Sequence, residues 1–577
     1  MSKEIIEKAQ AWLNAPIDAE TKKVIESMIS NEDQTELTDA FYKDLEFGTG
    51  GLRGIMGAGS NRINKYTVGM ATQGFANYLN QSFAGQQVSV AVAHDSRNNS
   101  RFFAETTAAV FSANGIKTYL FDALRPTPEL SYAIRELGCK GGVVLTASHN
   151  PKEYNGYKAY WDDGAQLTAP HDHNVINEVN KIAGIDEVKF EQNDELVELI
   201  GKEIDDKYLD RIKGICLSPE AVKNQHDLGI VFSSIHGTGI TLVPPILEKL
   251  GFTNVQVVKE QAEPDGNFPT VVYPNPEESE AMSIALKQAA DSNADIVMAT
   301  DPDSDRVGIG VKDSRGNFGL LNGNQTGALI VNYLLSKWQE NDLLTGKEYV
   351  VKTIVTTELI AEIAAEYKVK HYDTLTGFKF IASLIAKLEG KETFIGGGEE
   401  SYGYLISDFV RDKDAIASCA IIAEMTAYYK DQGKSLFDVL VEIYRTHGQY
   451  LEGLVSITKK GKSGAEEIRE MMKNLRSDPP KTLAGKKVIN LLDYSTQESK
   501  NLISGEVSAI DQPTSNVLQF LTEDGSKISA RPSGTEPKIK FYFSVKESLG
   551  SDENYFDKVE QLQGKIKEIQ SDLLKDQ

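Results

Sequence analysis

The sequence predicts an α/β protein of several domains that ends in a smaller domain of the α+β type. From Val88 onward, short apolar strands alternate with amphipathic helical patterns, which is typical of βαβ units. The alternation runs through three rounds before a tail of short strands begins near residue 450. At 577 residues the chain also exceeds what one hydrophobic core supports.

The composition is that of a globular protein, with 40% hydrophobic and 25% charged residues. A net charge of −23 argues against nonspecific binding of nucleic acid, because phosphates repel an acidic protein. The most apolar helical stretch falls short of the ~20 residues that cross a bilayer, and the charged N-terminus lacks a signal-peptide core. Three isolated cysteines indicate a reducing compartment. We therefore expect a cytoplasmic protein that binds neither nucleic acid nor membrane.

The first 40 residues are predicted to form an added helical segment. Apolar residues recur at helical spacing in 1–14 and 22–29, and the polar residues 31–33 end the second pattern. The glycine-rich stretch 47–54 follows, and its Arg53 offers a fixed fork of donors to an anion. The stretch lacks the ending of a P-loop, and a plain turn is the alternative interpretation.

Three rounds of strand and helix follow, and each is expected to contribute to a sheet that is largely parallel. In each round a later strand ends in a polar loop, which could place three functional loops around one cleft. The predicted strand and helix that open each round are 88–97 with 101–114, 228–239 with 242–250, and 349–357 with 358–367. The later strand of the first round ends in the turn of Ser148, and the later strands of the second and third rounds are residues 295–300 and 392–395.

Polar or glycine-rich segments near residues 205, 320 and 445 separate these rounds. They predict four domains, with boundaries at 1–205, 206–320, 321–445 and 446–577. The tail contains the predicted strands 488–492, 517–521 and 539–545 and a charged helix from residue 556.

The turn that follows the apolar run 141–145 carries the first candidate reactive group. Pro151 cannot donate to a strand ladder, so the strand ends and holds Ser148 close to its carboxyl end. Ligands bind at this end of open α/β sheets, so the hydroxyl beside His149 is a candidate nucleophile. A turn without chemistry is the alternative.

Three aspartates, Asp301, Asp303 and Asp305, follow another apolar strand at alternate positions. Carboxylates this close repel one another, and a bound divalent cation usually neutralises the repulsion. Mg²⁺ is the first candidate, ahead of Ca²⁺ and Mn²⁺. An EF-hand is excluded because Arg306 and Lys312 occupy the positions that need Gly and Glu. An aspartyl-phosphate nucleophile and a solvated acidic turn remain alternatives.

Two further loops have the composition of ligand sites. The loop 396–401 offers two carboxylates and a hydroxyl, which suit vicinal sugar hydroxyls, although a helix N-cap would use the same residues. The loop 531–538 combines a guanidinium, hydroxyls and a lysine in a phosphate-cradle composition, with a surface turn as the alternative.

Taken in order, four motifs resemble the α-D-phosphohexomutase superfamily, most closely its phosphoglucomutase/phosphomannomutase branch. The motifs are residues 146–151, 301–306, 398–403 and 531–537. The resemblance implies a heart-shaped, four-domain enzyme, in which three similar α/β domains with mixed sheets and a smaller α+β C-terminal domain surround one cleft. It implies interconversion of glucose 1-phosphate and glucose 6-phosphate, with mannose phosphates as further candidates.

In that family a phosphoserine donates its phosphoryl group to a sugar monophosphate, and the hexose 1,6-bisphosphate so formed returns the other group. Ser148 matches this serine, and Asp301, Asp303 and Asp305 would hold Mg²⁺ together with a phosphate oxygen on Ser148. The other implied catalytic residues are Arg53, His149, Lys158 and Lys379, and the implied substrate-binding residues are Arg306, Thr376, Gly377, Glu399, Ser401, Arg531, Ser533, Gly534, Thr535 and Lys538.

The N-terminal segment and residues 47–56 also resemble phosphopentomutases and glucose-1,6-bisphosphate synthases of the same branch, which are alternative activities. Two other classes remain open. A metal-dependent sugar phosphatase would release inorganic phosphate without needing a bisphosphate, and a non-catalytic protein would bind sugar phosphates without turnover. We expect a monomer or weak homodimer whose ligands are small sugar phosphates and whose activator is a hexose 1,6-bisphosphate.

Overall fold

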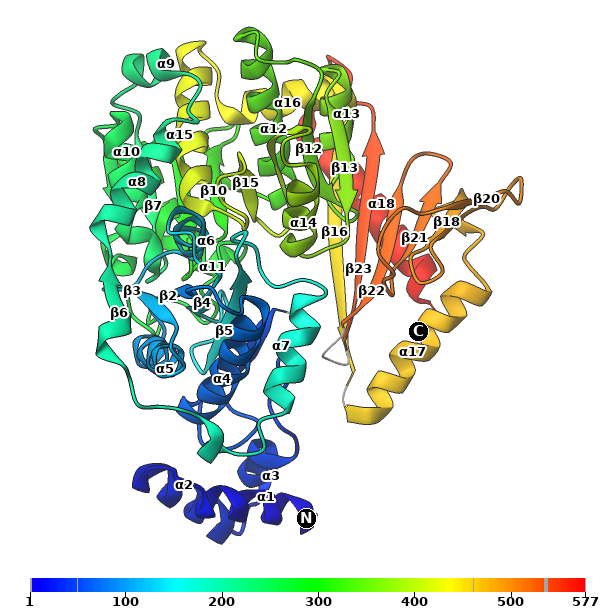
Figure 1. The fold of residues 1–577 in the computed structure, drawn as a ribbon. Coiled ribbons are helices and arrows are strands. Elements are labelled where there is room, and N and C mark those ends of the chain that lie inside the picture. The colour runs from blue at the N-terminus through cyan, green and yellow to red at the C-terminus, as the bar shows by residue number, and fades with distance from the viewer. Residues whose placement is uncertain (1–2, 49, 460, 534–537, 576–577) are drawn as a thin grey trace. The chain divides into compact units, whose positions relative to one another are not determined.

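The computed structural model describes residues 3–48, 50–459, 461–533 and 538–575 (Figure 1). The chain forms two compact units. Unit 1 contains residues 1–326 and 381–435, and unit 2 contains residues 327–380 and 436–577. Within the described residues, no helix is both long and apolar enough to cross a membrane.

The predicted helical segment at the N-terminus is confirmed, and its three helices share a small core; the third helix, at residues 35–41, was not predicted. Asp18 caps the second helix by accepting a hydrogen bond from the Thr21 N–H, and Asn31 ends that helix in an extended conformation. Ile25, Leu37 and Phe41 are fully buried in this core. The helices are α1 (Lys3–Asn14), α2 (Ala19–Ser30) and α3 (Thr35–Phe41).

The first sheet of unit 1 has the order β1-β5-β4-β2-β3-β6. Its centre is parallel, whereas β5 runs antiparallel to both β1 and β4. The strand and helix predicted for 88–97 and 101–114 are confirmed as β2 and α5. The elements are β1 (Gly51–Ile55), β2 (Ser89–His94), β3 (Lys117–Phe121), β4 (Gly141–Leu145), β5 (Tyr154–Trp161) and β6 (Val197–Ile200), with α4 (Lys65–Ser82), α5 (Ser100–Ala113), α6 (Thr127–Glu136) and α7 (His171–Asn180).

The second sheet of unit 1 has the order β11-β10-β9-β7-β8, with β10 antiparallel to β9 and β11. The strand predicted over 228–239 is too long, because β7 ends at Ser233 and both Ile235 and His236 have positive φ angles. The elements are β7 (Ile230–Ser233), β8 (Val255–Val257), β9 (Ile296–Thr300), β10 (Val307–Lys312) and β11 (Phe318–Leu321), with α8 (Lys202–Lys213), α9 (Pro219–Asn224), α10 (Val243–Leu250) and α11 (Ser279–Ser292).

Unit 1 also contains the antiparallel pair β14 (Thr393–Gly398) and β15 (Tyr404–Ile406), followed by α15 (Ala415–Asp431). The prediction that the third strand ends at Ile395 is wrong, because three glycines extend β14 to Gly398. A side chain at Gly398 would place its Cβ 2.4 Å from the carbonyl oxygen of Gly403. Glycine therefore permits the close approach of the two strands.

Unit 2 joins the parallel pair β12 and β13 to an antiparallel C-terminal sheet, which begins with the order β16-β23-β22-β21-β18. The predicted tail strands are confirmed as β18, β21 and β23, whereas β16 was not predicted. The elements are β12 (Glu348–Thr353), β13 (Lys370–Thr374), β16 (Gln449–Thr458), β17 (Thr482–Leu483), β18 (Lys486–Asp493), β19 (Glu498–Asn501), β20 (Val507–Ala509), β21 (Leu518–Thr522), β22 (Lys527–Pro532) and β23 (Lys538–Glu547), with α13 (Leu359–Glu366), α16 (Leu436–His447), α17 (Gly461–Ser477) and α18 (Tyr555–Leu574). Two helices, α12 (Gly323–Glu340) and α14 (Phe378–Leu388), include residues of both units.

Buried charges connect the two parts of unit 2. The Glu358 carboxylate accepts hydrogen bonds from Lys352 of β12, at 3.0 Å, and from Lys527 of β22. Gln519 of β21 donates to the carbonyl of Ile354 at 2.7 Å. The C-terminal sheet is therefore fixed to the β12 and β13 segment by specific polar contacts as well as by packing.

The first prediction concerns Gly51, which has φ +130° and would place a Cβ 1.7 Å from the carbonyl oxygen of Tyr157. We expect Gly51→Ala to lower the free energy of unfolding by more than the roughly 1–2 kcal/mol that a left-handed backbone alone costs. Gly85→Ala is the matched control, since Gly85 also has positive φ but open space around it. Equal shifts of the thermal midpoint in both variants would rule out the backbone clash.

Candidate active site

The turn after β4 holds Ser148 in a buried and left-handed conformation, with φ +53° and 4% exposure. Its N–H donates to Thr146 Oγ1 at 2.8 Å, and its Oγ donates to Asp301 Oδ2 at 2.9 Å. The His149 Nδ1 atom lies 3.1 Å from the same Oγ. The predicted position of Ser148 near a strand's carboxyl end is confirmed, and the hydroxyl also contacts the aspartate loop of the second sheet.

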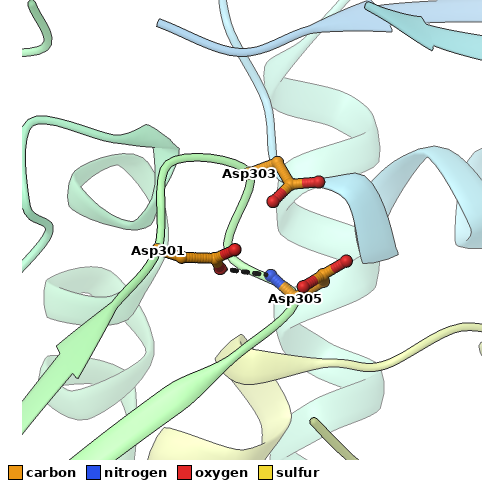
Figure 2. Close-up of side chains that lie close together, drawn as sticks. All are labelled: Asp301, Asp303 and Asp305. Atoms are coloured by element: carbon orange, nitrogen blue, oxygen red, sulfur yellow. Dashed lines mark hydrogen bonds between the residues drawn. The ribbon is translucent and has the colours of Figure 1, made fainter. Parts of the chain in front are cut away.

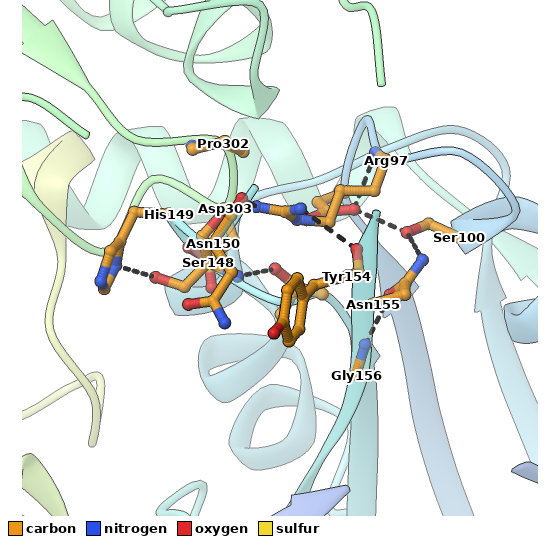
Figure 3. Close-up of polar contacts among 12 residues, drawn as sticks. Arg97, Ser100, Ser148, His149, Asn150, Tyr154, Asn155, Gly156, Pro302 and Asp303 are labelled. Atoms are coloured by element: carbon orange, nitrogen blue, oxygen red, sulfur yellow. Dashed lines mark hydrogen bonds and ion pairs between the residues drawn. The ribbon is translucent and has the colours of Figure 1, made fainter. Parts of the chain in front are cut away.

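Arg97, directly after β2, fixes the backbone of this turn (Figure 3). Its buried guanidinium donates to four backbone carbonyl groups, and its Nε lies 3.4 Å from the Asp95 carboxylate. A left-handed non-glycine residue costs free energy unless its surroundings hold it. The carbonyl partners of Arg97 are Ser148 (2.5 Å), Asn150 (2.5 Å), Pro151 (2.9 Å) and Tyr154 (3.2 Å).

A second layer of polar groups orients Arg97. Asp95 accepts hydrogen bonds from the Arg97 N–H at 2.9 Å and from Ser100 Oγ at 2.6 Å. Asn155 donates to Ser100 Oγ at 3.0 Å, and the ring of Phe268 lies 5.0 Å from the guanidinium carbon. Sequence analysis did not find Arg97 as a site residue, although its place after an apolar strand is the same signal that marked the other loops.

Asp301, Asp303 and Asp305 occupy the loop after β9, and all three are buried (Figure 2). Ligand oxygens from the three carboxylates lie within 4.8 Å of one another. Asp301 Oδ1 accepts the N–H groups of Asp305 and Arg306, both at 3.1 Å. Burial raises the pKa of Asp301 well above its ordinary value, and the charges of Asp303 and Asp305 act in the same direction.

The donor set of this loop fits a hard divalent cation. All of its side-chain ligand atoms are carboxylate oxygens, which Mg²⁺ and Ca²⁺ prefer. Within the part of the chain that the structure describes, the Oδ1 atoms of Asp303 and Asp305 are buried without a hydrogen-bond partner, which is costly unless a ligand satisfies them. The carboxylate cluster could therefore hold a metal ion directly beside Ser148.

Two lysines provide positive charge around the cluster. Lys158 Nζ, from β5, lies 2.6 Å from Asp303 Oδ2 and 3.1 Å from Asp305 Oδ2, and Lys413 Nζ lies 3.2 Å from Asp305 Oδ2. Burial alone would raise the pKa of Asp305, but Lys158 and Lys413 hold it well below its ordinary value. Burial favours neutral lysines, yet the carboxylates raise the pKa of both lysines, so both stay charged.

Lys413 and Thr127 are further residues of this site that the sequence analysis missed. Thr127, the first residue of α6, donates its N–H and its hydroxyl to the carbonyl and the carboxylate of Asp303, each at 2.9 Å. Lys413 also lies 3.3 Å from Asp412 Oδ1, and Tyr160 donates to the other oxygen of Asp412 at 2.7 Å. The alternating charges 411–414 before an apolar helix were the available signal.

The loop after β14 belongs to the same unit as the aspartates. Glu399 is buried, its N–H donates to the Gly403 carbonyl at 2.9 Å, and the half-buried Ser401 lies in the same turn. The Val307 N–H donates to the Tyr402 carbonyl at 3.1 Å, so this turn is attached to the first residue of β10. The structure therefore joins the predicted sugar loop to the aspartate loop.

The remaining unit 1 residues differ in charge state and exposure. Burial opposes the charged form of Arg306, but its ion pair with Glu277 raises the pKa of that guanidinium above its ordinary value. Burial, and then the charges of Arg306 and Arg53, lower the pKa of His149 well below its ordinary value. His149 is consequently neutral at physiological pH. Arg53 is exposed on β1, and the charges of the three aspartates act on it.

The other predicted site residues belong to unit 2. Arg531 is the penultimate residue of β22, and the Ser533 N–H donates to the Lys538 carbonyl at 2.7 Å, which closes the hairpin between β22 and β23. Gly534 and Thr535 lie outside the described residues.

A second group of predicted residues in unit 2 lies between β13 and α14. Thr376 Oγ1 is buried without a hydrogen-bond partner, Gly377 has φ +119°, and Lys379 Nζ lies 5.3 Å from the centre of the Phe380 ring. This group and the hairpin are thus parts of one unit.

Four family models match the chain in order. Their descriptions are phosphoglucomutase/phosphomannomutase alpha/beta/alpha domains I, II and III and the C-terminal domain. They match residues 44–185, 206–316, 322–447 and 462–562.

Curated relatives cover most of the chain. A phosphoglucomutase of Staphylococcus haemolyticus is 38% identical over 526 residues, which are 90% of this chain and 94% of the relative. A phosphoglucomutase of Staphylococcus aureus is 38% identical over 541 residues, which are 93% of this chain and 95% of the relative.

Solved structures are similar in fold. A putative phosphomannomutase from Thermus thermophilus has a TM-score of 0.68 at 21% identity, with 92% of this chain and 99% of that chain covered. The phosphoglucomutase parafusin from Paramecium also has a TM-score of 0.68, at 19% identity, with 92% and 96% coverage.

The second prediction tests the Arg97 network. Arg97→Met leaves Asp95 and four carbonyl groups without their buried partner, so we expect a loss of about 3–5 kcal/mol in the free energy of unfolding. Arg469→Met is the matched control, because Arg469 is exposed on α17 and pairs with Glu466 on the helix surface, where such pairs contribute about 1 kcal/mol or less. Similar midpoints of thermal unfolding for the two variants would contradict the network.

The third prediction uses the raised pKa of Asp301. Such a carboxyl destabilises the metal-free fold as pH rises from its ordinary pKa of about 4 toward the higher folded value. In chelator, we expect Asp301→Asn to unfold at a higher temperature than the wild type at pH 7 and at the same temperature at pH 4. Added Mg²⁺ should stabilise only the wild type. A wild type that is more stable than the variant at pH 7 in chelator contradicts this.

Proposed function

The chain belongs to the phosphoglucomutase/phosphomannomutase family of isomerases, and from this we propose that it interconverts glucose 1-phosphate and glucose 6-phosphate through a phosphoserine at Ser148. The relatives named phosphoglucomutase support glucose as the sugar. Mannose phosphates are the second candidate, because the family models and one similar structure carry the phosphomannomutase name.

The observation that carries this proposal is the contact between Ser148 Oγ and Asp301 Oδ2 at 2.9 Å. It brings a buried hydroxyl, which can carry a phosphoryl group, to the edge of three carboxylates that could hold a metal ion. Phosphoryl transfer depends on position and charge stabilisation more than on covalent help from the protein. The site supplies both.

We assign the metal position to Mg²⁺, held by Asp301, Asp303, Asp305 and a phosphate oxygen on Ser148. When bound, the ion would neutralise charge on the group being transferred. The protein contributes positive charge through Lys158, which lies within 3.1 Å of two of the aspartates. Arg53, Arg306 and Lys413 add to the positive potential of the site.

The transfer from Ser148 to a sugar hydroxyl requires a proton acceptor. Lys158 stays charged and can only donate, whereas His149 is neutral and its Nδ1 lies 3.1 Å from Ser148 Oγ. We therefore assign the acceptor role to His149. Arg53, on which the charges of the three aspartates act, is assigned to the phosphoryl oxygens.

Substrate recognition is assigned to both units. In unit 1, Glu399 and Ser401 bind sugar hydroxyls and Arg306 binds phosphate. In unit 2, the hairpin binds the phosphate that is not transferred, and the unpartnered Thr376 hydroxyl supports a sugar contact by the turn before α14. The unit 2 residues assigned to these roles are Thr376, Gly377, Lys379, Arg531, Ser533, Gly534, Thr535 and Lys538.

We further propose domain boundaries at residues 205, 320 and 445. We also propose that a hexose 1,6-bisphosphate activates the enzyme and that the protein is a cytoplasmic monomer or weak homodimer. Phosphopentomutase and bisphosphate synthase activities are tested by assays with ribose 1-phosphate and with a phosphoryl donor. A phosphatase would release inorganic phosphate from the same substrates.

The fourth prediction tests Ser148 directly. Intact mass spectrometry of the purified protein should show a phosphorylated fraction that maps to the peptide containing Ser148, and glucose 1,6-bisphosphate should increase it. Ser148→Ala should lose mutase turnover but still bind glucose 6-phosphate, because the other ligand groups remain. Ser131→Ala is the matched control, since Ser131 is a buried serine on α6 that hydrogen-bonds to a backbone carbonyl.

Two outcomes would contradict the proposal. Label from the bisphosphate on Asp301 or Asp303 would favour an aspartyl-phosphate enzyme. Full activity of Ser148→Ala would remove the phosphoserine from the reaction.

A further inference from the structure

A cavity of about 800 Å³ lies in unit 1 between the N-terminal helices and the first sheet. Its volume is within the range of small-molecule sites. Helix α1 forms one wall through Trp12, α4 forms another through Met70, and the segment after α7 contributes Ile182. None of the residues assigned to the active site lines it.

The cavity is partly built by a segment outside the family models. The first model begins at residue 44, whereas α1 to α3 lie before that residue. These helices pack against α4 through the Trp12 ring, whose centre lies 5.9 Å from that of Tyr66, and through a hydrogen bond between Tyr66 and Asp18. The N-terminal helices are therefore firmly attached, and the space beneath them is a defined feature of the fold.

The chemistry of the cavity is uneven. Its walls are mainly apolar, and the charged lining residues are Lys8, Asp44 and Asp186. Lys8 Nζ lies 3.3 Å from the Asp44 carboxylate, so these two charges compensate each other. Asp186 is exposed and has no ion-pair partner among the described residues. The charged groups of the cavity thus carry one uncompensated negative charge.

We propose that this cavity binds a small hydrophobic monocation, with an apolar body against Trp12 and Met70 and an ammonium group beside Asp186. Burial of the apolar body supplies the driving force. The carboxylate selects the charge of the head group, although an exposed pair contributes only modestly to affinity.

Strand β1 connects the cavity to the active site. Leu52 lines the cavity and is 5% exposed, and the next residue is Arg53, on which the charges of the aspartates act. Adjacent residues of a strand point to opposite faces. Among the named strands within the described residues, β1 is the terminal strand of its sheet and pairs with β5, so one strand ladder holds it. A ligand that displaces Leu52 therefore shifts Arg53, and this coupling rests on the proposed function.

Binding is tested with three probes that share one apolar body and differ in charge: 1-adamantylmethylamine, 1-adamantanemethanol and 1-adamantanecarboxylate. Calorimetric titration of the full chain should give the tightest binding for the amine, about two- to five-fold tighter than for the alcohol. Asp186→Asn should lower the affinity for the amine to that for the alcohol. Equal affinities in the wild type, or tighter binding of the carboxylate, would overturn the assignment of a cation.

The location is tested by filling the mouth of the cavity. Ala11 and Ala183 line it from two sides and are exposed, so Ala11→Phe and Ala183→Phe should fold normally. Each should weaken binding of the amine at least roughly ten-fold, a loss of about 1.4 kcal/mol. Ala84→Phe, at an exposed alanine away from the cavity, is the matched control. Binding that survives both filling variants would place the probe elsewhere and overturn the site.

The coupling is tested separately. Saturating amine should change kcat or KM for glucose 1-phosphate by about five-fold or more in the wild type, and not in Ala11→Phe. Binding without any change in turnover would retain the site and overturn the coupling. If the chain turns over no hexose phosphate at all, the proposed function fails while the binding measurements still decide the site.

Discussion

The repulsion between three buried carboxylates constrains the rest of unit 1. Asp301, Asp303 and Asp305 are removed from water, where each negative charge would cost several kcal/mol unless it is compensated. Compensation comes from elements far apart in the sequence: Lys158 on β5, Lys413 before α15 and the first turn of α6. The second sheet is fixed against the first because its charged loop needs these partners.

The same constraint bears on the phosphoserine that we propose at Ser148. A phosphoryl group on Ser148 would bring more negative charge to the carboxylates, which a bound cation and the lysines would have to balance. Arg97 contacts the turn through backbone carbonyl groups, so it fixes the position of Ser148 without forming a hydrogen bond to the serine hydroxyl. Arg97 thus fixes the backbone position, whereas Lys158 and Lys413 provide positive charge beside the carboxylates.

Sequence reasoning found the parts of the site that are local in the chain. A buried strand followed by a polar loop identifies Ser148 and the aspartates, since both the burial and the side-chain chemistry are visible within ten residues. Arg97 and Lys413 were missed because the contacts that tie them to the site are distant in the chain: Arg97 donates to Ser148, 51 residues away, and Lys413 pairs with Asp305. Without knowledge of these distant contacts, the pattern of charged residues predicts only a solvated turn.

The fold was predicted where a strand has a continuous apolar pattern, and strands without that pattern were missed. Strands with a fully buried pattern, such as β9, were found, whereas β16, with alternately half-buried and exposed residues, was missed. The glycines of β14 were interpreted as a loop because glycine weakens strands in general. Only the position of the Gly403 carbonyl shows why a strand needs glycine there.

The division of the chain into two units separates the residues that we propose as functional. The third family model spans residues 322–447, yet residues 381–435 belong with the aspartate loop and residues 327–380 with the C-terminal sheet. Glu399 therefore belongs to the unit that holds Ser148, whereas Thr376 and Arg531 belong to the other unit, in which Glu358 links β12 to β22.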